Sequence, residues 1–320
     1  MTTDTEARPA ASDADRPGRI DAVPVRHPGR WVAIAVIAVL FAMLVHLLVT
    51  NKAFDWSFVF QAMSQQPVIN GFIKGTLLVT VLSMIVGVVG GVILAVMRLS
   101  DNPILAGVAW VFTWFFRSIP RYILLFTMGT LGILFQQGVS FGVPFDWKIM
   151  EWLGLSGDWR FYTLDANQIF TGLVAGVIGL GLSEAAYMAE IARAGILSVD
   201  KGQAEAAEAL GMGSGKVMRR VVLPQAMRVI VPPTGNETIA MLKDTSLLLA
   251  VPVLGELFYQ LQSIGSTYYK TFPIAVAATL YYLAATSVLM VGQYFLERHF
   301  GRGFGNKAPR ATRPAGAGGA

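Results

Sequence analysis

Long apolar runs alternate with short polar segments along most of this 320-residue chain. A helix of about 20 apolar residues is long enough to cross the hydrocarbon core of a bilayer. Six such runs predict six membrane-spanning helices, at residues 31–50, 69–99, 104–135, 168–197, 227–259 and 272–296. No segment shows the alternating pattern of a β-strand, so we predict an all-α integral membrane protein.

Two of the six runs contain polar or helix-breaking residues. The third run is interrupted at residues 116–121, which include two arginines, and the fifth contains prolines at positions 232, 233 and 252. Proline cannot donate a backbone hydrogen bond, and an ionisable side chain inside a span is costly unless it faces protein or water. We therefore predict that both helices are broken and face a cavity or a partner helix.

The polar segments divide the chain into regions. Residues 1–30 and 299–320 hold few large apolar residues, which predicts disordered tails. Residues 31–50 lack a small-x-small cleavage site and therefore predict an anchor helix, while residues 68–298 form the main transmembrane domain. Residues 51–68 and 136–167 mix aromatic with polar residues, a pattern that predicts segments lying in the outer membrane interface.

The distribution of Lys and Arg along the chain predicts the orientation of these spans in the membrane. The net charge is +5, and the Lys and Arg residues concentrate in short loops and in the C-terminal tail, next to apolar runs. The positive-inside rule then places those loops and both termini in the cytoplasm. The same distribution does not match a nucleic-acid-binding surface. With no cysteine and three scattered histidines, the sequence predicts no disulfide, no metal site and no catalytic set.

The most informative polar segment is residues 198–226, between the fourth and fifth runs. Ser198 or Asp200 can cap a helix, residues 205–210 are good helix formers, and Gly211 supplies a left-handed stop. Pro224 is tolerated in the first turn of a helix, so it predicts that the next helix begins there. The segment is therefore predicted to form a short helix, a turn and a new helix.

The spacing within this segment resembles the EAA signature of the membrane subunits of ATP-binding-cassette importers. The matching residues are Glu205, Ala206, Ala207, Gly211, Leu223 and Pro224. Valine stands at position 221, where that signature usually has isoleucine. The resemblance implies that these residues belong to a cytoplasmic coupling helix and its surroundings, which dock on a separate ATP-binding subunit.

Further strings resemble polar amino acid importer permeases, a family with a five-helix core. They are the segment Arg117-Ser118-Ile119-Pro120, residues 186–190 and the polar residues of the fifth run. The resemblance covers about residues 68–298, so residues 31–50 are an extra N-terminal helix. Ser118 and Ile119 stand where that family usually has Gly-Thr, and Arg121 follows the proline.

That resemblance implies the permease subunit of an ATP-driven importer for polar amino acids, which an extracytoplasmic binding protein delivers. It also implies a second copy of the permease or a similar permease, surrounding lipid, no nucleic acid, and a place in the bacterial inner (cytoplasmic) membrane. ATP and magnesium belong to the partner subunit, so this chain holds no cofactor and is not an enzyme. Residues 211–217 resemble a phosphate loop, but the glycine spacing is one residue short and Val217 replaces the required hydroxyl.

Polar residues inside the spans are the candidates for a substrate path: Arg117, Glu184, Tyr187, Asn236, Glu237, Lys243, Asp244, Thr245 and Ser246. Opposite charges on broken or glycine-rich backbone suit recognition of a zwitterion, although Lys243 and Asp244 equally fit a role in helix packing. An alternative function is an ion-coupled secondary transporter, in which Glu184, Glu190, Glu237 and Asp244 relay protons. Such a transporter has no use for a docking helix.

Overall fold

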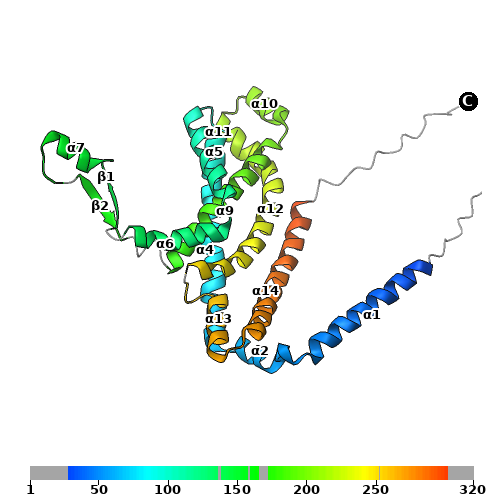
Figure 1. Ribbon diagram of the computed structural model, residues 1–320. Coiled ribbons are helices and arrows are strands. Elements are labelled where there is room, and N and C mark those ends of the chain that lie inside the picture. The colour runs from blue at the N-terminus through cyan, green and yellow to red at the C-terminus, as the bar shows by residue number, and fades with distance from the viewer. Residues whose placement is uncertain (1–27, 136–137, 158, 166–171, 252, 302–320) are drawn as a thin grey trace, which may run out of the picture. The chain divides into compact units, whose positions relative to one another are not determined.

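The computed structural model describes residues 28–135, 138–157, 159–165, 172–251 and 253–301 (Figure 1). Most of the two tails predicted to be disordered, residues 1–30 and 299–320, lies outside the described residues. The chain divides into two units, residues 1–52 and 53–320, which are described separately below.

The first unit contains one helix, α1 (Pro28–Thr50), which covers the predicted anchor at residues 31–50. Its 23 residues are strongly apolar, and none of them is buried within the chain. A helix that is apolar all round needs lipid or another protein around it, so α1 has the properties of a membrane-spanning segment.

The second unit begins with a short 3-10 turn (Lys52–Phe54) and helix α2 (Trp56–Met63), followed by a long helix from Gln66 to Arg98. The long helix consists of α3 (Gln66–Asn70), a π-helical stretch (Gly71–Leu77) and α4 (Leu78–Arg98). The chain continues through α5 (Pro103–Ser118) and α6 (Arg121–Leu134) to α9 (Gly172–Leu197). The predicted second and fourth spans are therefore confirmed as helices.

The third predicted span is broken, as expected, but more sharply than a kink. Asn102 caps α5 by accepting a hydrogen bond from the backbone N–H of Ile104, at 2.9 Å. Helices α5 and α6 then meet at an angle of 103° across Ile119 and Pro120. A residue before proline avoids the helical conformation, and Ile119 is extended, with φ −93° and ψ 129°. The two helices form either a broken span or a re-entrant segment.

The fifth predicted span breaks at a different place from the one expected. Helix α12 (Leu223–Asp244) contains Pro232 and Pro233 without interruption, and the chain changes only after Asp244. A 3-10 stretch (Thr245–Ala250), α13 (Leu257–Tyr268) and α14 (Thr271–Phe300) follow. The predicted break at residues 232–233 is therefore wrong.

Polar side chains form two hydrogen bonds close to the two prolines of α12. The hydroxyl of Thr234 donates to the carbonyl oxygen of Ile230 at 2.8 Å, and Nε2 of Gln293 in α14 donates to the carbonyl oxygen of Pro232 at 2.9 Å. The carbonyls that Pro232 and Pro233 deprive of a helical N–H are those of Arg228 and Val229, four residues earlier, so these two bonds stabilise the neighbouring turn of the helix. Among the described residues, four helices are long and apolar enough to span a membrane, or five if α5 and α6 count as one span. Because α12 is too polar to be among them, the count of six is not confirmed.

The segment between α6 and α9 corrects the expectation that the chain has no strands. Strands β1 (Val139–Gly142) and β2 (Arg160–Leu164) pair antiparallel, with a register shift between Phe141 and Gly142, and α7 (Asp146–Leu153) lies between them in the chain. Each strand is only four or five residues long, and no two-residue turn joins them. The sequence therefore lacks the usual hairpin signal, although the fold remains overwhelmingly helical.

Helix α9 is the centre of the second unit, because it packs against α4, α5, α6 and α12. Glycines of α4 allow this helix to lie close to α9. A Cβ atom on Gly87 would lie 2.5 Å from Cγ of Glu184, and one on Gly91 would lie 2.4 Å from Cβ of Met188. Small residues allow this close approach in membranes, where the hydrophobic effect does not drive helices together. Gly87 and Gly91 therefore allow α4 and α9 to pack at short distance.

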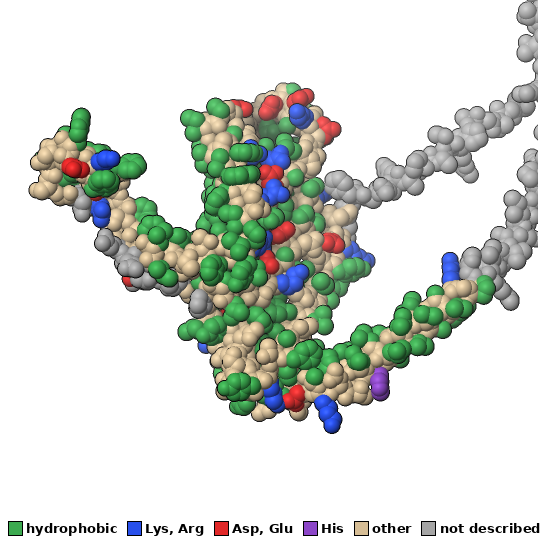
Figure 2. All heavy atoms as spheres, viewed as in Figure 1, with side chains coloured by type: hydrophobic (Ala, Val, Ile, Leu, Met, Phe, Trp, Pro, Cys, Tyr) green, Lys and Arg blue, Asp and Glu red, His purple; other side chains and the backbone are tan. Residues whose placement is uncertain are grey.

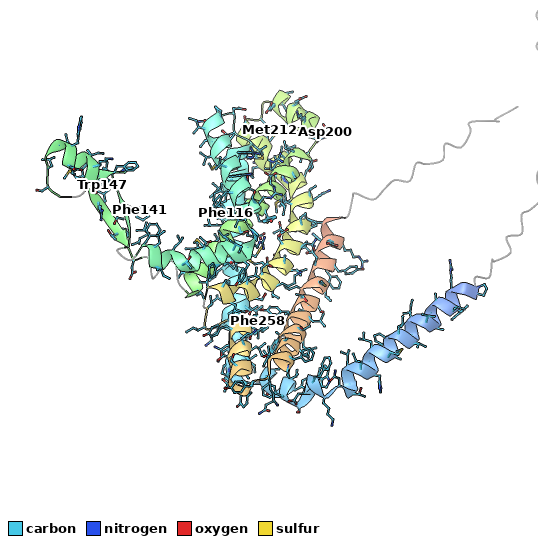
Figure 3. All side chains as sticks on the ribbon, viewed as in Figure 1. Phe116, Phe141, Trp147, Asp200, Met212 and Phe258 are labelled. Atoms are coloured by element: carbon cyan, nitrogen blue, oxygen red, sulfur yellow. The ribbon has the colours of Figure 1, made fainter. Side chains whose placement is uncertain are left out.

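A second set of contacts lies where α2, α13 and α14 pack together (Figure 3). The fully buried carboxylate of Glu256 accepts hydrogen bonds from the hydroxyls of Thr76 and Tyr282, at 2.8 and 2.9 Å. Its other oxygen accepts from the backbone N–H of Phe258, at 2.6 Å. Both oxygens of this buried carboxylate are therefore satisfied, and Glu256 holds three parts of the chain together.

An ion pair outside the spans joins the start of α2 to the start of α14. The ammonium group of Lys270 lies 2.5 Å from Oδ2 of Asp55 and holds the pKa of that carboxyl below its ordinary value. Because the lowered pKa belongs to the folded state, the pair stabilises the fold above the unfolded-state pKa. That contribution is lost as the pH falls through the lowered value.

Candidate functional site

Three carboxylates inside the helical unit converge on Arg121, the first residue of α6. Its Nη2 donates to Oε2 of Glu184 in α9 at 2.9 Å, and its Nη1 donates to Oδ2 of Asp244 at the end of α12. Oε2 of Glu237, also in α12, lies 3.8 Å from Nη2. One guanidinium therefore connects α6, α9 and α12. We call these four residues the Arg121 cluster.

The Arg121 cluster contains more negative than positive charge. Three carboxylates surround one guanidinium, and Glu184 is completely buried. Oε1 of Glu184 is buried and has no hydrogen-bond partner among the described residues. A buried carboxylate oxygen without a hydrogen-bond donor is costly in a low-dielectric medium, and ionisable residues within membrane segments commonly mark a substrate or ion pathway. The cluster is thus suited to receive a cationic group.

The local sequence explains how these side chains reach one another. Pro120 ends the extended link after α5, so that Arg121 begins α6 and points back toward α9 across the 103° bend. Gly87 in α4 leaves the space that the side chain of Glu184 fills. Both features depend on residues whose conformations are restricted or whose side chains are minimal.

Tyr187 lies one turn after Glu184 in α9 and contacts two arginines. The guanidinium carbon of Arg121 lies 5.0 Å from the centre of the Tyr187 ring, and that of Arg117 lies 5.4 Å from it. Cation–π contacts at this range are attractive, so the ring forms a common wall between the Arg121 cluster and the neighbouring surface of α5.

The predicted substrate-path residues separate into two groups. Glu184, Tyr187, Glu237 and Asp244 come together, and Arg117 joins them through Tyr187.

The remaining candidates lie outside the Arg121 cluster. Asn236 and Lys243 are exposed, the buried hydroxyl of Thr245 donates to the carbonyl oxygen of Leu242, and Ser246 donates to that of Lys243.

Arg121 itself is absent from the predicted set, although it is the residue that all three carboxylates share. A signal was present, because two arginines within an apolar run flank a proline. The family string has its arginine before the proline, which favours Arg117 over Arg121. The bend of 103° between α5 and α6 determines which of the two arginines contacts α12. The sequence pattern does not predict that angle.

The segment at residues 198–226 has most of the predicted local structure. Helix α10 (Lys201–Ala209) begins after Asp200, whose Oδ1 accepts from the backbone N–H of Gly202 at 2.7 Å. Gly211 has a φ of 81°, the left-handed conformation expected after a helix. Asp200 and Met212 lie at the same end of the structure (Figure 3).

Ala207, on the buried side of α10, packs with Val217 and Val222, whereas Glu205 and Ala206 are exposed. Two residues of the signature in α10 therefore face outward, and the third packs against the rest of the chain. Its docking role stays a prediction, because no partner is present.

Helix α12 begins at Leu223 with Pro224 in its first turn, as expected, but helical structure already precedes it. Helical structure resumes at α11 (Ser214–Val217), continues through a π-helical stretch (Met218–Val222) and leads directly into α12. Pro224 lacks the N–H that would bond to the carbonyl four residues earlier. A π-helical turn changes the bonding pattern just before the proline, which lets the helix continue. Leu223 and Pro224 are both exposed.

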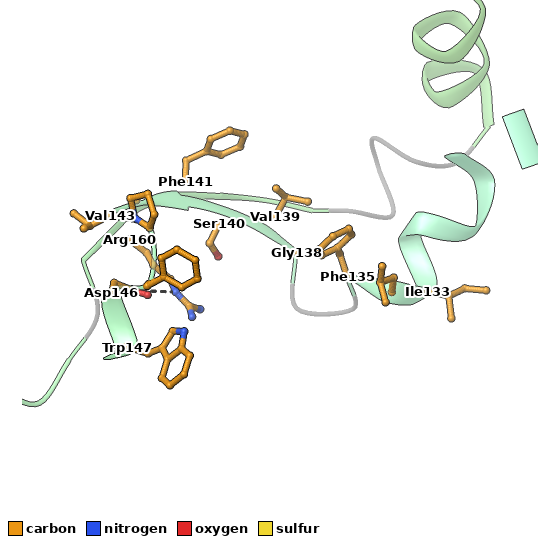
Figure 4. A pocket seen from close by; sticks show the side chains of 14 residues that line it. Ile133, Phe135, Gly138, Val139, Ser140, Phe141, Val143, Asp146, Trp147 and Arg160 are labelled. Carbon is orange, nitrogen blue, oxygen red and sulfur yellow. Dashed lines mark ion pairs between the residues drawn. The ribbon is translucent and has the colours of Figure 1, made fainter. Parts of the chain in front are cut away.

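A further cavity lies away from these features, at the segment between α6 and α9. It has a volume of about 870 Å³ and is lined by residues at the end of α6, by β1 and by the start of α7 (Figure 4). An ion pair at 3.6 Å joins Asp146 to Arg160 beside it. The cavity holds no nucleophile with an adjacent base, and no cluster in the described part of the chain could hold a metal ion.

Comparisons with known proteins agree with one another. Residues 87–302 match the profile of a family described as "Binding-protein-dependent transport system inner membrane component". An arginine transport system permease protein of Corynebacterium glutamicum is 44% identical over 306 residues, which are 94% of this chain and 89% of that protein. A probable amino-acid permease protein of Bacillus subtilis is 32% identical over 244 residues, which are 76% of this chain and 95% of that protein.

A solved structure, described as an amino acid ABC transporter with histidines, resembles this fold with a TM-score of 0.54 and 29% identity. The match covers 73% of this chain and 94% of that chain. The sequence matches and the structural match therefore point to the same class of protein.

Proposed function

This chain belongs to the family of binding-protein-dependent transport system inner membrane components, and we propose that it is the permease subunit of an ATP-driven amino acid importer. Relatives that match most of their own length are permeases for amino acids, as is the similar solved transporter. The permease forms the route through the membrane and does not itself catalyse a reaction.

The transported amino acids are cationic, with arginine as the leading candidate. Two independent observations support this substrate class. The arginine permease of Corynebacterium glutamicum is 44% identical over nearly the whole chain. The Arg121 cluster places three carboxylates around one guanidinium and leaves a buried oxygen of Glu184 without a partner among the described residues. A guanidinium or ammonium group of the substrate would offset the excess negative charge and bond to the carboxylates.

This excess of carboxylates inside the spans is the observation that carries the proposal for a substrate path. Glu184, Glu237 and Asp244 come from α9 and α12, two helices that must shift relative to each other if the path alternates between the two faces of the membrane. A ligand that binds between these helices more tightly in one conformation than in the other shifts the equilibrium between the two conformations.

The segment around α10 is the proposed docking site for an ATP-binding subunit. Glu205 and Ala206 are exposed on a short helix with small side chains, which can lie close in a groove of a partner. Lys216, Arg219 and Arg220 follow it in the chain, so the positive-inside rule assigns this end, and both termini, to the cytoplasm. An external binding protein supplies substrate at the other face.

In the resulting cycle, two permeases and two ATP-binding subunits act together. ATP binding closes the motor subunits, which draws the two α10 helices together and opens the spans outward to receive the amino acid. Hydrolysis restores the inward-open state. The second permease is another copy of this chain or a similar chain.

The test is uptake of L-arginine into proteoliposomes that contain the permease, its ATP-binding subunit and the external binding protein. We expect uptake that requires internal ATP and the ATP-binding subunit, and that is absent with a proton gradient alone. Uptake driven by the proton gradient without ATP would contradict the proposal and favour a secondary transporter. In the described structure Glu190 pairs with Arg193 at 2.8 Å and not with the Arg121 cluster, so one of the four carboxylates of that relay lies apart from the other three.

A further inference from the structure

A second charged region adjoins the Arg121 cluster on its α5 side. Figure 2 shows basic and acidic side chains gathered over α5, α9 and α12 in the middle of the visible face. A cavity of about 400 Å³ lies there, lined by Arg98 at the end of α4, Arg117 in α5, and Tyr187, Glu190 and Arg193 in α9. This volume is much larger than that of one water molecule, about 30 Å³, and it can hold a small organic ion.

The cavity has the opposite excess charge to the Arg121 cluster. Three guanidinium groups line it with one carboxylate, and that carboxylate is already occupied. Oε2 of Glu190 accepts from Nε and Nη2 of Arg193, at 3.0 and 2.8 Å. In the described part of the chain, neither Arg98 nor Arg117 forms an ion pair. Both guanidinium groups are therefore available to a ligand, that of Arg98 on a partly buried side chain and that of Arg117 on an exposed one.

Arg98 provides a second, independent sign of a missing ligand. Its Nε is buried and has no hydrogen-bond partner among the described residues. Arginine does not lose its charge in proteins, and a buried donor without a partner costs free energy. A ligand with acceptor oxygens would remove that cost. The planar guanidinium matches a carboxylate especially well, because two parallel N–H groups can meet its two oxygens.

We propose that this cavity is a subsite for the carboxylate of the transported amino acid, an inference that rests on the proposed function. Tyr187 lines the cavity, and its ring contacts both Arg117 and Arg121. The basic cavity and the acidic cluster thus share one wall. A cationic amino acid carries a carboxylate at one end and a cationic side chain at the other. Its carboxylate binds at Arg98 and Arg117, and its side chain binds at the carboxylates of the Arg121 cluster.

The experiment compares two ligands that differ only in this group. The permease, assembled with its ATP-binding subunit in lipid nanodiscs, is titrated with L-arginine and with agmatine, which is arginine without its carboxylate. We expect the wild-type complex to bind L-arginine more tightly than agmatine. Arg98→Gln weakens L-arginine binding by about 10-fold or more, the effect of one charge-assisted hydrogen bond, and leaves agmatine binding unchanged.

Two further variants keep the result interpretable. Arg98→Lys retains the charge without the planar fork and gives an intermediate loss for L-arginine only. Arg298→Gln, in the exposed last turn of α14, removes a cation outside the cavity and changes neither affinity.

Equal losses for the two ligands, or no loss for either, would overturn the carboxylate subsite while leaving the importer intact. A wild-type complex that binds neither ligand would contradict the proposed function itself. The titrations are repeated in nanodiscs of phosphatidylcholine with and without phosphatidylglycerol. An Arg98→Gln effect that appears only with phosphatidylglycerol would assign the cavity to a lipid headgroup and overturn the proposal.

Discussion

Gly211→Val is expected to abolish ATP-driven uptake of arginine while leaving a folded permease in the membrane. Gly211 has a φ of 81°, and the left-handed region costs a β-branched residue at least about 1 kcal/mol. No atom lies within 4 Å of the position that a Cβ atom would take, so the cost arises from the backbone and not from a clash. Relief of that strain rotates the end of α10 and misplaces Glu205 and Ala206 for docking.

The structure supplies a matched control in the same turn. Gly213 also has open space where a Cβ atom would lie, but its backbone is extended, with φ −68° and ψ 152°. Valine adopts that conformation readily, so Gly213→Val keeps uptake. The measurements are uptake, co-purification with the ATP-binding subunit, and thermal unfolding of the purified permease. Full uptake and normal co-purification by Gly211→Val would remove α10 from the coupling mechanism.

The second large effect is expected from Glu184→Gln, which should weaken arginine binding to the assembled complex by about 10- to 100-fold. Loss of a charge-assisted hydrogen bond accounts for a change of this size. Glutamine keeps the shape of the side chain beside Gly87, and Arg121 keeps Asp244 as a partner. The fold therefore persists while the excess negative charge falls.

Glu297→Gln is the control, because Glu297 lies in the exposed last part of α14 and glutamine can still accept the hydrogen bond from Gln293. Binding is measured by titration calorimetry at one ionic strength. Unchanged affinity in Glu184→Gln, together with reduced thermal stability, would make Glu184 a structural residue and not a ligand-binding one.

How much of this arrangement could be derived from the sequence depends on the range of the interactions. The helices at 66–98, 172–197 and 271–300 follow from apolar length, and the cap at Asp200 with the stop at Gly211 follows from local chemistry. These features depend on residues within a few positions of one another, so a single sequence contains their causes.

The features that could not be predicted depend on distant residues. Pro232 and Pro233 remain in a continuous helix that packs against α14, and Gln293, which lies far along the chain in α14, bonds to the carbonyl oxygen of Pro232. Arg121 becomes the centre of the charged cluster through the 103° bend, which sets α6 against α9 and α12. The short strands β1 and β2 pair although α7 lies between them in the chain. Each strand is too short for its alternation of apolar and polar residues to stand out.

The most direct test of the account is an electron cryo-microscopy map of the permease with its ATP-binding subunits in nanodiscs, in the presence of L-arginine. The account predicts ligand density inside the permease, with the guanidinium within hydrogen-bonding distance of Glu184, Glu237 or Asp244. The same density should be absent from a Glu184→Gln complex at the same ligand concentration. Density for arginine elsewhere in the permease, with the Arg121 cluster unoccupied and closed, would contradict the central claim that this cluster lies on the substrate path.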